Sequence, residues 1–315
     1  KNRIDVFLIN RTDEFFTEYI ASYAERLNWI SNFSGSAGKA IILKKKAYLF
    51  VDGRYVIQAK NQVNRKLFSI RSIHDYYFIL EKKINLKNTI GIDATLHSIF
   101  EINQLRKIFN KKKTHIKLLK TNPIDLLWKN QPGYPKAKAF IHHVKYAGQS
   151  RESKIKLIQR KLKKESIDYY LLTSLESIAW LLNIRGNDVK YTPLVISHLI
   201  IPSFGKLELF IDKRKIIKIR KKLTKKVNFH TFNNIYSFIK KIDRNNVVGL
   251  DINKTNFSLQ EICIKNKLKL KFIEDPCIYL KAQKNKIEII GAKKANIRDG
   301  ISIIKFLYWL KNKMK

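Results

Sequence analysis

Short apolar runs recur along the chain and are separated by polar segments that contain glycine or proline. The runs at 4–9, 40–43 and 47–51 are rich in β-branched and aromatic residues and have the length of buried strands. The stretch 153–165 instead repeats apolar residues at every third or fourth position, which is typical of a helix with one buried face. Because strand-like and helix-like segments alternate, the pattern predicts an α/β fold.

The same order of landmarks occurs twice. The runs at 4–9 and 27–33 are matched by 167–172 and 178–184, and a glycine-containing loop and a strand pair follow the second run in each half. Each strand pair ends at an aspartate that has an arginine two residues later. The matched positions are Asp52 with Arg54 and Asp212 with Arg214. The duplication predicts two similar domains, each a mixed sheet flanked by helices.

The segment 131–135 contains two prolines and a glycine, breaks both periodicities and is expected to link the two domains. The expected domains are 1–131 and 136–275. A third segment, 281–315, is expected to be a helix with one apolar face, formed by Ile287, Ile290, Ile297, Ile301, Ile304 and Tyr308. A lone amphipathic helix cannot bury that face, so its partner is either the second domain or a domain absent from this chain.

The composition indicates a folded protein, because hydrophobic residues make up 45% of the chain and aromatic residues 11%. The longest apolar stretch, near 194–201, is much shorter than the roughly 20 residues that a membrane span needs, so no membrane partner is expected. Cys263 and Cys277 have neither CxxC spacing nor a nearby histidine. They are expected to be reduced thiols of a cytoplasmic protein, without a zinc site.

The net charge of +39 has two interpretations. It indicates either a nucleic-acid partner or the Lys-, Asn- and Ile-rich composition that an AT-rich genome produces. The basic runs at 44–46, 111–113, 221–222 and 225–226 are scattered, and no arginine-rich stripe is interleaved with aromatic residues. We therefore expect no specific nucleic-acid partner, only weak, salt-sensitive binding to polyanions.

Two motifs resemble ligand sites but fail in detail. The segment 34–39 ends in Gly-Lys but lacks the spacing of a phosphate-binding loop and precedes a strand, so a tight turn is expected. His142 and His143 are adjacent, and neighbours on a strand point to opposite faces, so a shared metal is not expected. Trp29 and Trp180 are expected to be core residues.

Two polar loops leave alternatives open. Arg54 lies where a buried strand ends and a helix over 55–63 is expected, and ligands gather beyond strand ends in α/β sheets. Its guanidinium either holds a carboxylate or carbonyl there, or is a surface charge beside a helix-capping Asp52. The loop 185–188 either faces a cleft or forms a solvated turn with an internal ion pair.

Strings spread over nearly the whole chain together resemble aminopeptidase P, a family that removes an N-terminal residue preceding proline. The specific strings are FSGSAG at 33–38, DGRY at 52–55 and IAWLLNIRGND at 178–188, with shorter ones at 11–14, 18–20, 25–27 and 296–300. The resemblance implies two creatinase-type N-terminal domains before a C-terminal pita-bread domain, peptides with proline at the second position as substrates, and a homodimer. It also implies that Arg54 binds substrate, because the matching arginine projects toward the peptide.

The family's catalysis uses two divalent metal ions, usually manganese, held by two Asp, one His and two Glu in the third domain. After Pro276 this chain has no histidine, and its carboxylates there are Glu288 and Asp299. On a helix these two lie about 16.5 Å apart along the axis and cannot share a metal centre. The resemblance therefore implies an N-terminal fragment that binds no metal and is inactive alone, with 281–315 as the first helix of the pita-bread domain. The alternative is a non-catalytic binding module with the same fold.

Overall fold

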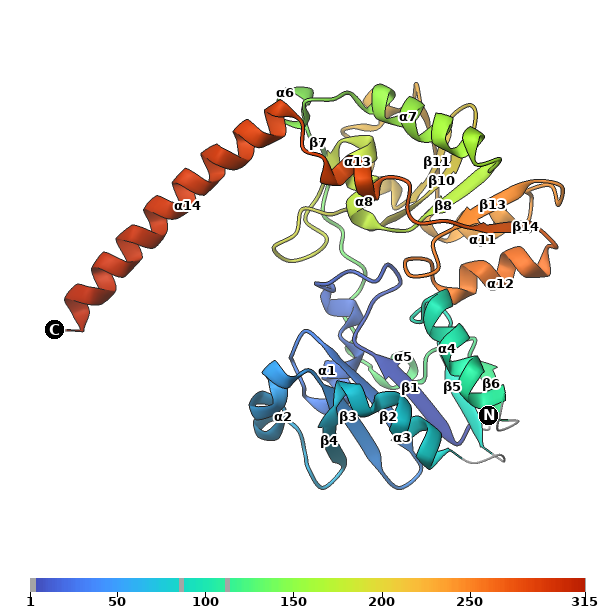
Figure 1. The fold of residues 1–315 in the computed structure, drawn as a ribbon, viewed down its shortest axis with the longest axis vertical. Coiled ribbons are helices and arrows are strands. Elements are labelled where there is room, and N and C mark those ends of the chain that lie inside the picture. The colour runs from blue at the N-terminus through green and yellow to red at the C-terminus, as the bar shows by residue number, and fades with distance from the viewer. Residues whose placement is uncertain (1–3, 85–87, 111–113, 315) are drawn as a thin grey trace.

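The computed structural model describes residues 4–84, 88–110 and 114–314 and contains two six-stranded mixed sheets (Figure 1). In the first sheet the strand order is β4-β3-β2-β1-β5-β6. The β1–β2 and β2–β3 pairs are antiparallel, and the β3–β4, β1–β5 and β5–β6 pairs are parallel. The strands are β1 (Val6–Asn10), β2 (Gly38–Leu43), β3 (Ala47–Val51), β4 (Phe68–Ser72), β5 (Thr89–Ile92) and β6 (His115–Leu118).

The second sheet repeats this arrangement, with the order β12-β11-β10-β8-β13-β14 and the same sequence of antiparallel and parallel pairs. Two domains of like topology were predicted from the duplicated landmarks, and this prediction is confirmed. The strands are β8 (Tyr169–Leu172), β10 (Ser197–Pro202), β11 (Leu207–Ile211), β12 (Val227–His230), β13 (Val247–Leu250) and β14 (Lys269–Phe272). A two-stranded ribbon, β7 (Phe140–Ile141) with β9 (Ile184–Arg185), is separate from both sheets.

Helices flank both sheets. Those of the first domain are α1 (Arg26–Ser31), α2 (Val56–Gln62), α3 (Tyr76–Lys83), α4 (Ile99–Asn110) and α5 (Pro123–Leu127). Those that follow are α6 (Val144–Ala147), α7 (Arg151–Lys164), α8 (Leu175–Leu182), α9 (Lys213–Ile216), α10 (Arg220–Leu223), α11 (Ile235–Ile239), α12 (Phe257–Lys265) and α13 (Ile278–Ala282). Within the described residues, no helix combines the length and the apolar character needed to cross a bilayer.

Both faces of the first sheet are buried. Val6 and Leu8 of β1 pack into one cluster with residues of α3 and α4, and Phe7 and Ile9 pack into another with residues of α1, α2 and α5. Because successive side chains of a strand point to opposite faces, a run of apolar residues without alternation is what such a two-faced sheet requires. The short uninterrupted runs in the sequence therefore had the pattern of central strands.

One segment of the first domain belongs to the core of the second. Phe15, Ile20, Tyr23 and Ala24 are buried in the hydrophobic cluster that also contains residues of β8, β10 and β11. The two sheets are therefore not held together by the linker alone. The segment between β1 and α1 crosses to the second domain and contributes apolar side chains to it.

The chain ends in α14 (Lys286–Lys313), which projects from the second domain as a long arm (Figure 1). A capping box fixes its first turn, because the Asn285 side chain accepts from the Glu288 N–H and the Glu288 carboxylate accepts from the Asn285 N–H. Asn285 Nδ2 also donates to the carbonyl of Ala147, at 2.8 Å. The predicted apolar face is uncovered: Ile297 is 64% and Ile304 67% exposed.

Three expectations need correction. The expected helix over 281–315 begins only at Lys286, since the residues up to Ala282 belong to α13. Trp29 is not a core residue, because it is 37% exposed and stacks on Trp128 at the surface, with ring centroids 5.8 Å apart. Trp180 is buried, as expected. His142 and His143 lie after the two-residue strand β7 rather than on a strand, and His143 caps α6.

Candidate functional site

Arg54 lies in the 3-10 turn Gly53–Tyr55, directly after β3. Asp52 caps this turn by accepting from the Arg54 N–H, and it also accepts from Arg54 Nε at 2.8 Å. The Arg54 side chain is 72% exposed, and its hydrogen bond lowers the pKa of the Asp52 carboxyl. These contacts are those of one alternative drawn from the sequence, a surface charge beside a capping Asp52. The other alternative, that Arg54 holds a carboxylate or carbonyl of a ligand, stays a prediction.

The second domain repeats this arrangement of side chains. Asp212 accepts from the Arg214 N–H at the start of α9, and Arg214 Nη2 donates to Asp212 Oδ2 at 2.6 Å. The bond from Arg214 is the main cause that lowers the pKa of Asp212 to about 2. The duplication thus extends from the sheet topology to the orientation of one ion pair, although the glycine and the tyrosine occur only in the first copy.

The DGRY turn is bonded to the FSGSAG loop. Tyr55 Oη lies 2.5 Å from Ser36 Oγ, and the Tyr55 ring meets the edge of the Phe33 ring with centroids 5.9 Å apart. Gly35 passes over Phe33 so closely that a Cβ there would lie 2.2 Å from the ring. The loop therefore needs glycine at this position for close approach, as the expected tight turn suggested, and it supports the turn that carries Arg54.

Arg11 connects the same loop to two further strings of the resemblance. Its Nη1 donates to the carbonyls of Ser36 at 3.1 Å and Glu18 at 3.3 Å, and its Nη2 pairs with Glu25 at 3.1 Å. Burial raises the pKa of the Glu25 carboxyl, and Arg11 opposes this shift. Arg11 thus links the segments of Glu18 and Glu25 to the FSGSAG loop, which in turn contacts the turn that carries Arg54.

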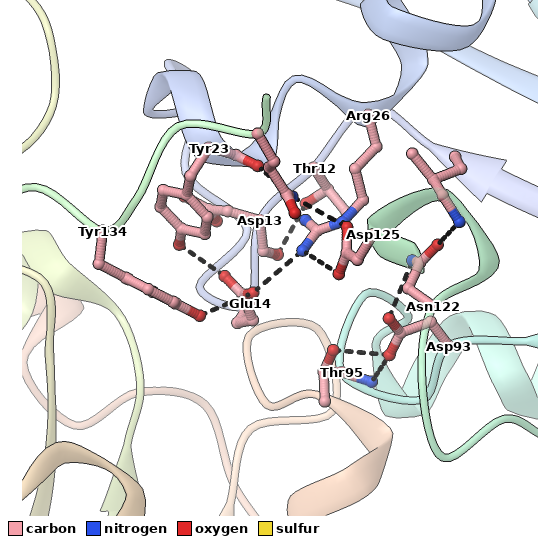
Figure 2. Close-up of polar contacts among 12 residues, drawn as sticks. Thr12, Asp13, Glu14, Tyr23, Arg26, Asp93, Thr95, Asn122, Asp125 and Tyr134 are labelled. Carbon is pink, nitrogen blue, oxygen red and sulfur yellow. Dashed lines mark hydrogen bonds and ion pairs between the residues drawn. The ribbon is translucent and has the colours of Figure 1, made fainter. Parts of the chain in front are cut away.

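A polar network joins the first domain to the linker, as Figure 2 shows. Glu14 accepts from Tyr23 Oη at 2.6 Å and from Tyr134 Oη of the linker at 3.3 Å. Arg26 lies 3.8 Å from Glu14 and forms a two-point bond with Asp125, at 2.7 and 3.0 Å. These five side chains line a cleft of about 560 Å³ between the domains.

Asp13 shapes the loop that crosses to the second domain. Its carboxylate accepts from the Phe15 N–H at 3.0 Å, the Thr17 N–H at 3.1 Å and Thr17 Oγ1 at 2.5 Å. Burial raises the pKa of Asp13 to about 6, against the opposing effect of these bonds. Phe16 has a left-handed φ of 55°, and the residue before it, Phe15, is buried in the core of the second domain.

The second domain completes this contact. Asn256 caps α12 and also donates from Nδ2 to the carbonyl of Glu14, at 3.1 Å. In the sequence, Glu14 and Arg26 belong to strings of the resemblance, and no pattern indicates a role for Asp125 or Tyr134. Their partners lie 99 and 120 residues away along the chain, and no local pattern reports such a distance.

The loop 185–188 matches the interpretations drawn from the sequence only in part, because Arg185 lines a cavity beside α14 whereas Asp188 pairs outside the loop. Asp188 is buried, pairs with the buried Lys215 and accepts from the Ile196 N–H at 2.7 Å. Arg185 points elsewhere, donating from Nη1 to the carbonyls of Ala179 at 2.8 Å and Ile184 at 2.9 Å. The expected solvated turn with an internal ion pair is therefore wrong, because the aspartate takes its cation from a residue 27 positions later.

Among the described residues, no group of three or more His, Cys, Asp or Glu side chains could hold a metal ion. Cys263 and Cys277 are buried and unpaired, as expected of reduced thiols. The geometry of the described residues therefore offers binding groups, an exposed guanidinium and an interdomain cleft, rather than a metal centre.

Comparison with known proteins identifies the family. Two models of the creatinase/prolidase N-terminal domain match the chain, one over residues 1–121 and the other over 130–288. The chain belongs to the creatinase/prolidase N-terminal domain family. The matched ranges correspond to the two domains of like topology, so each sheet with its helices is one creatinase-type unit.

The relatives are aminopeptidases. The chain is 30% identical to a probable Xaa-Pro aminopeptidase P of Laccaria bicolor, covering 100% of this chain and 50% of that protein. A probable Xaa-Pro aminopeptidase P of Coprinopsis cinerea is also 30% identical, with 98% and 53% covered. The resemblance to aminopeptidase P is thus confirmed for the family, and the chain spans about half the length of the relatives it matches.

A solved structure agrees with this assignment. The X-prolyl aminopeptidase of Caenorhabditis elegans is 26% identical and matches with a TM-score of 0.89, over 98% of this creatinase-type chain and 52% of that enzyme. That protein is described as a cytosolic enzyme with a di-nuclear active site. Both N-terminal domains and their mutual arrangement are therefore similar in the two proteins.

Proposed function

We propose that the chain is the N-terminal part of an Xaa-Pro aminopeptidase and that it shapes the entrance through which peptides with proline at the second position reach a catalytic domain. The observation that carries this proposal is the match to such enzymes over the whole chain and about half of their length. The division of the chain into 1–131, 136–275 and a helix of the catalytic domain within 281–315 belongs to the same proposal.

The described residues do not fit a dinuclear metal site, so no catalytic step is derived for them. In the proposed intact enzyme, two divalent metals, manganese by the resemblance, would activate water for hydrolysis of the peptide bond. They would be held by a domain that follows α14. The uncovered apolar face of α14 supports this part of the proposal, because such a face is stable in water only when another element covers it.

Arg54 is the proposed contact of this chain with substrate. It is exposed, is held at the base by Asp52, and lies on a turn braced by Tyr55 and Ser36. A guanidinium in that position can donate two parallel hydrogen bonds to a peptide carbonyl or a terminal carboxylate. Holding the peptide in register lowers the barrier to attack at its scissile bond.

The cellular location and the oligomeric state of the enzyme are proposed from the same relatives. We propose a cytoplasmic enzyme, as the C. elegans relative is described, and a homodimer, as the family resemblance implies. A non-catalytic module that keeps the fold is the competing function. The two differ in what the complete reading frame encodes.

The test uses the full-length protein and the isolated chain side by side. Cleavage of a tripeptide with proline at the second position is assayed in the presence of manganese. We expect turnover by the full-length protein and none by residues 1–315. A folded full-length protein that binds manganese without cleaving such peptides would favour the non-catalytic module, and turnover by the isolated chain would contradict the proposal.

A further inference from the structure

A wedge-shaped cavity, called the cationic wedge below, lies between the N-terminal turns of α14 and the second domain. Its volume is about 970 Å³, and it lies among α14, α6 and the β7–β9 ribbon. Five cationic side chains line it: Lys145, Arg185, Lys284, Lys294 and Arg298. The single carboxylate among the described lining residues belongs to Glu288, which is already engaged in the capping box of α14.

The positive charge of the wedge is only partly compensated among the described residues, because Glu288 is one carboxylate beside five cations. None of its five cations takes part in the ion pairs found there. Arg185 is partly buried and donates to two backbone carbonyls, and desolvation lowers its pKa. The Glu288 carboxylate opposes this shift, but it is one negative charge beside five cations, so an anionic group from outside would be attracted to the wedge.

Two further titratable side chains, Lys154 and His142, lie near Arg185. Lys154 is buried behind the wedge, where its Nζ donates to Trp180 O at 3.0 Å and to Asn183 Oδ1 at 2.8 Å. Desolvation lowers its pKa to about 8. The pKa of His142 is lowered by burial first and then by Arg185 and Lys154. An approaching carboxylate would be attracted by the charges of Arg185 and Lys154 and would favour protonation of His142.

The wedge is also apolar. Tyr146, Ile287, Ile290 and Ile297 line it, and each is between 41% and 64% exposed. Gly291 lies among them, and a Cβ there would meet nothing within 4 Å. Glycine inside a helix is unfavourable relative to alanine, and the open space above Gly291 would admit a closely packed partner. The occupant therefore combines apolar side chains with carboxylates.

We propose that the cationic wedge is the docking surface for an acidic and apolar face of the catalytic domain. This inference rests on the proposed function. Charge decides against a second copy of this chain, because each copy carries 64 Lys and Arg residues against 25 Asp and Glu residues. The relatives of the chain are about twice its length, so a further domain of sufficient size accompanies this fold in them.

The test measures whether docking of α14 depends on the wedge charges. Phe306, Tyr308 and Trp309 are chymotrypsin sites near the end of α14, and each is more than half exposed here. In the full-length protein at low salt we expect slow cleavage at these sites. The double variant Lys294→Glu, Arg298→Glu and the single variant Arg185→Gln are expected to be cleaved at least tenfold faster, and high salt should accelerate cleavage of the wild type.

A matched control is available in the first domain. Lys60 and Arg65 are exposed and distant from the wedge lining, so Lys60→Glu with Arg65→Glu makes the same charge change without an expected effect. Equal cleavage rates in wild type and wedge variants, or rapid cleavage of the full-length wild type, would overturn the docking proposal. Peptidase activity is assayed separately. An active enzyme whose protection from chymotrypsin does not depend on the wedge charges would contradict this inference alone. An inactive protein whose protection does depend on them would contradict the proposed function alone.

Discussion

The ring of Phe15 lies against the imidazole of His198, with centroids 4.8 Å apart and planes inclined by 37°. Phe15 comes from the loop after β1 of the first domain, and His198 from β10 of the second. Phe232 completes the group, 5.1 Å from His198. This aromatic contact is the point at which the first domain enters the core of the second, so it reports on the whole interdomain arrangement.

The same contact predicts an acid sensitivity. Burial lowers the pKa of His198 to about 3, so the folded protein binds fewer protons than the unfolded chain between pH 6.5 and pH 3. The stability that depends on neutral His198 is therefore complete above about pH 6.5 and is lost as the pH falls through that window. His198→Phe should keep the packing and remove this loss. Urea unfolding at pH 7 and pH 4.5 should show that the variant loses about 2 kcal/mol less than the wild type.

A variant that retains the full acid-dependent loss would contradict the assignment. His198→Ala is the comparison that separates protonation from packing. It also removes the titrating ring but leaves a cavity, so it should be destabilised at both pH values.

Two glycines of the site provide a matched pair of substitutions. Gly35→Ala should lower the free energy of unfolding by about 1–3 kcal/mol, because the new Cβ would overlap the Phe33 ring. Gly53→Ala should change it by less than about 0.5 kcal/mol, because nothing lies within 4 Å of that Cβ. Thermal or urea unfolding of the two variants checks both values. Equal effects would mean that the FSGSAG loop is not held against Phe33 as described.

Substitution of Arg54 tests its proposed role in the full-length enzyme. Arg54→Lys and Arg54→Ala should both melt near the wild-type temperature, because the side chain is exposed and its partner Asp52 is a solvated cap. Both should lower kcat/KM for tripeptides by tenfold or more, since lysine cannot form the two-point bond. Arg214→Ala is the control, because it breaks the equivalent pair in the second domain. If Arg54→Ala and Arg214→Ala have equal kcat/KM values, Arg54 has no role in substrate binding.

The apolar face of α14 predicts self-association of the isolated chain. Replacing Ile297, Ile301 and Ile304 by Gln should reduce light scattering of concentrated residues 1–315, because these side chains are 49–67% exposed. Replacing Lys293 and Lys305 by Gln should not. A wild-type chain that remains a monomer under the same conditions would show that the exposed face is tolerated in water.

The sequence allowed the sheets to be predicted better than the site. Runs such as 47–51 are short, apolar and bounded by turns, and these local properties define a buried strand wherever it occurs. The repeated order of landmarks also predicted that the two halves share one topology, as the two sheets do. By contrast, Trp29 and Trp180 occupy matched positions, yet one is at the surface and the other is buried. The difference depends on what packs against each helix, which no pattern within the helix records.

Charged pairs were the hardest feature to anticipate. One interpretation of the loop 185–188 paired Asp188 with Arg185, three residues away, but Asp188 pairs with Lys215 and both are buried. Burial favours a pair only when both groups leave water together, and this depends on the three-dimensional packing. The Glu14 and Asp125 network was missed for the same reason. Arg54 was identified by family resemblance, and its exposure could be known only from the structure.

The hydrogen bond between Asn285 and Ala147 fixes the start of α14 on the second domain, so the direction of the whole helix depends on this joint. Gly148 has a left-handed φ of 67°, and a Cβ there would lie 2.2 Å from Asn285 Oδ1, so the joint tolerates little bulk. The arm beyond it has 28 residues and a length of about 42 Å, so a tilt of about 5° at the joint would move its far end by about 4 Å. A methyl group added at Gly148 would therefore cause a small shift at the joint and a larger displacement at the far end of α14. A domain attached to that end would move relative to Arg54.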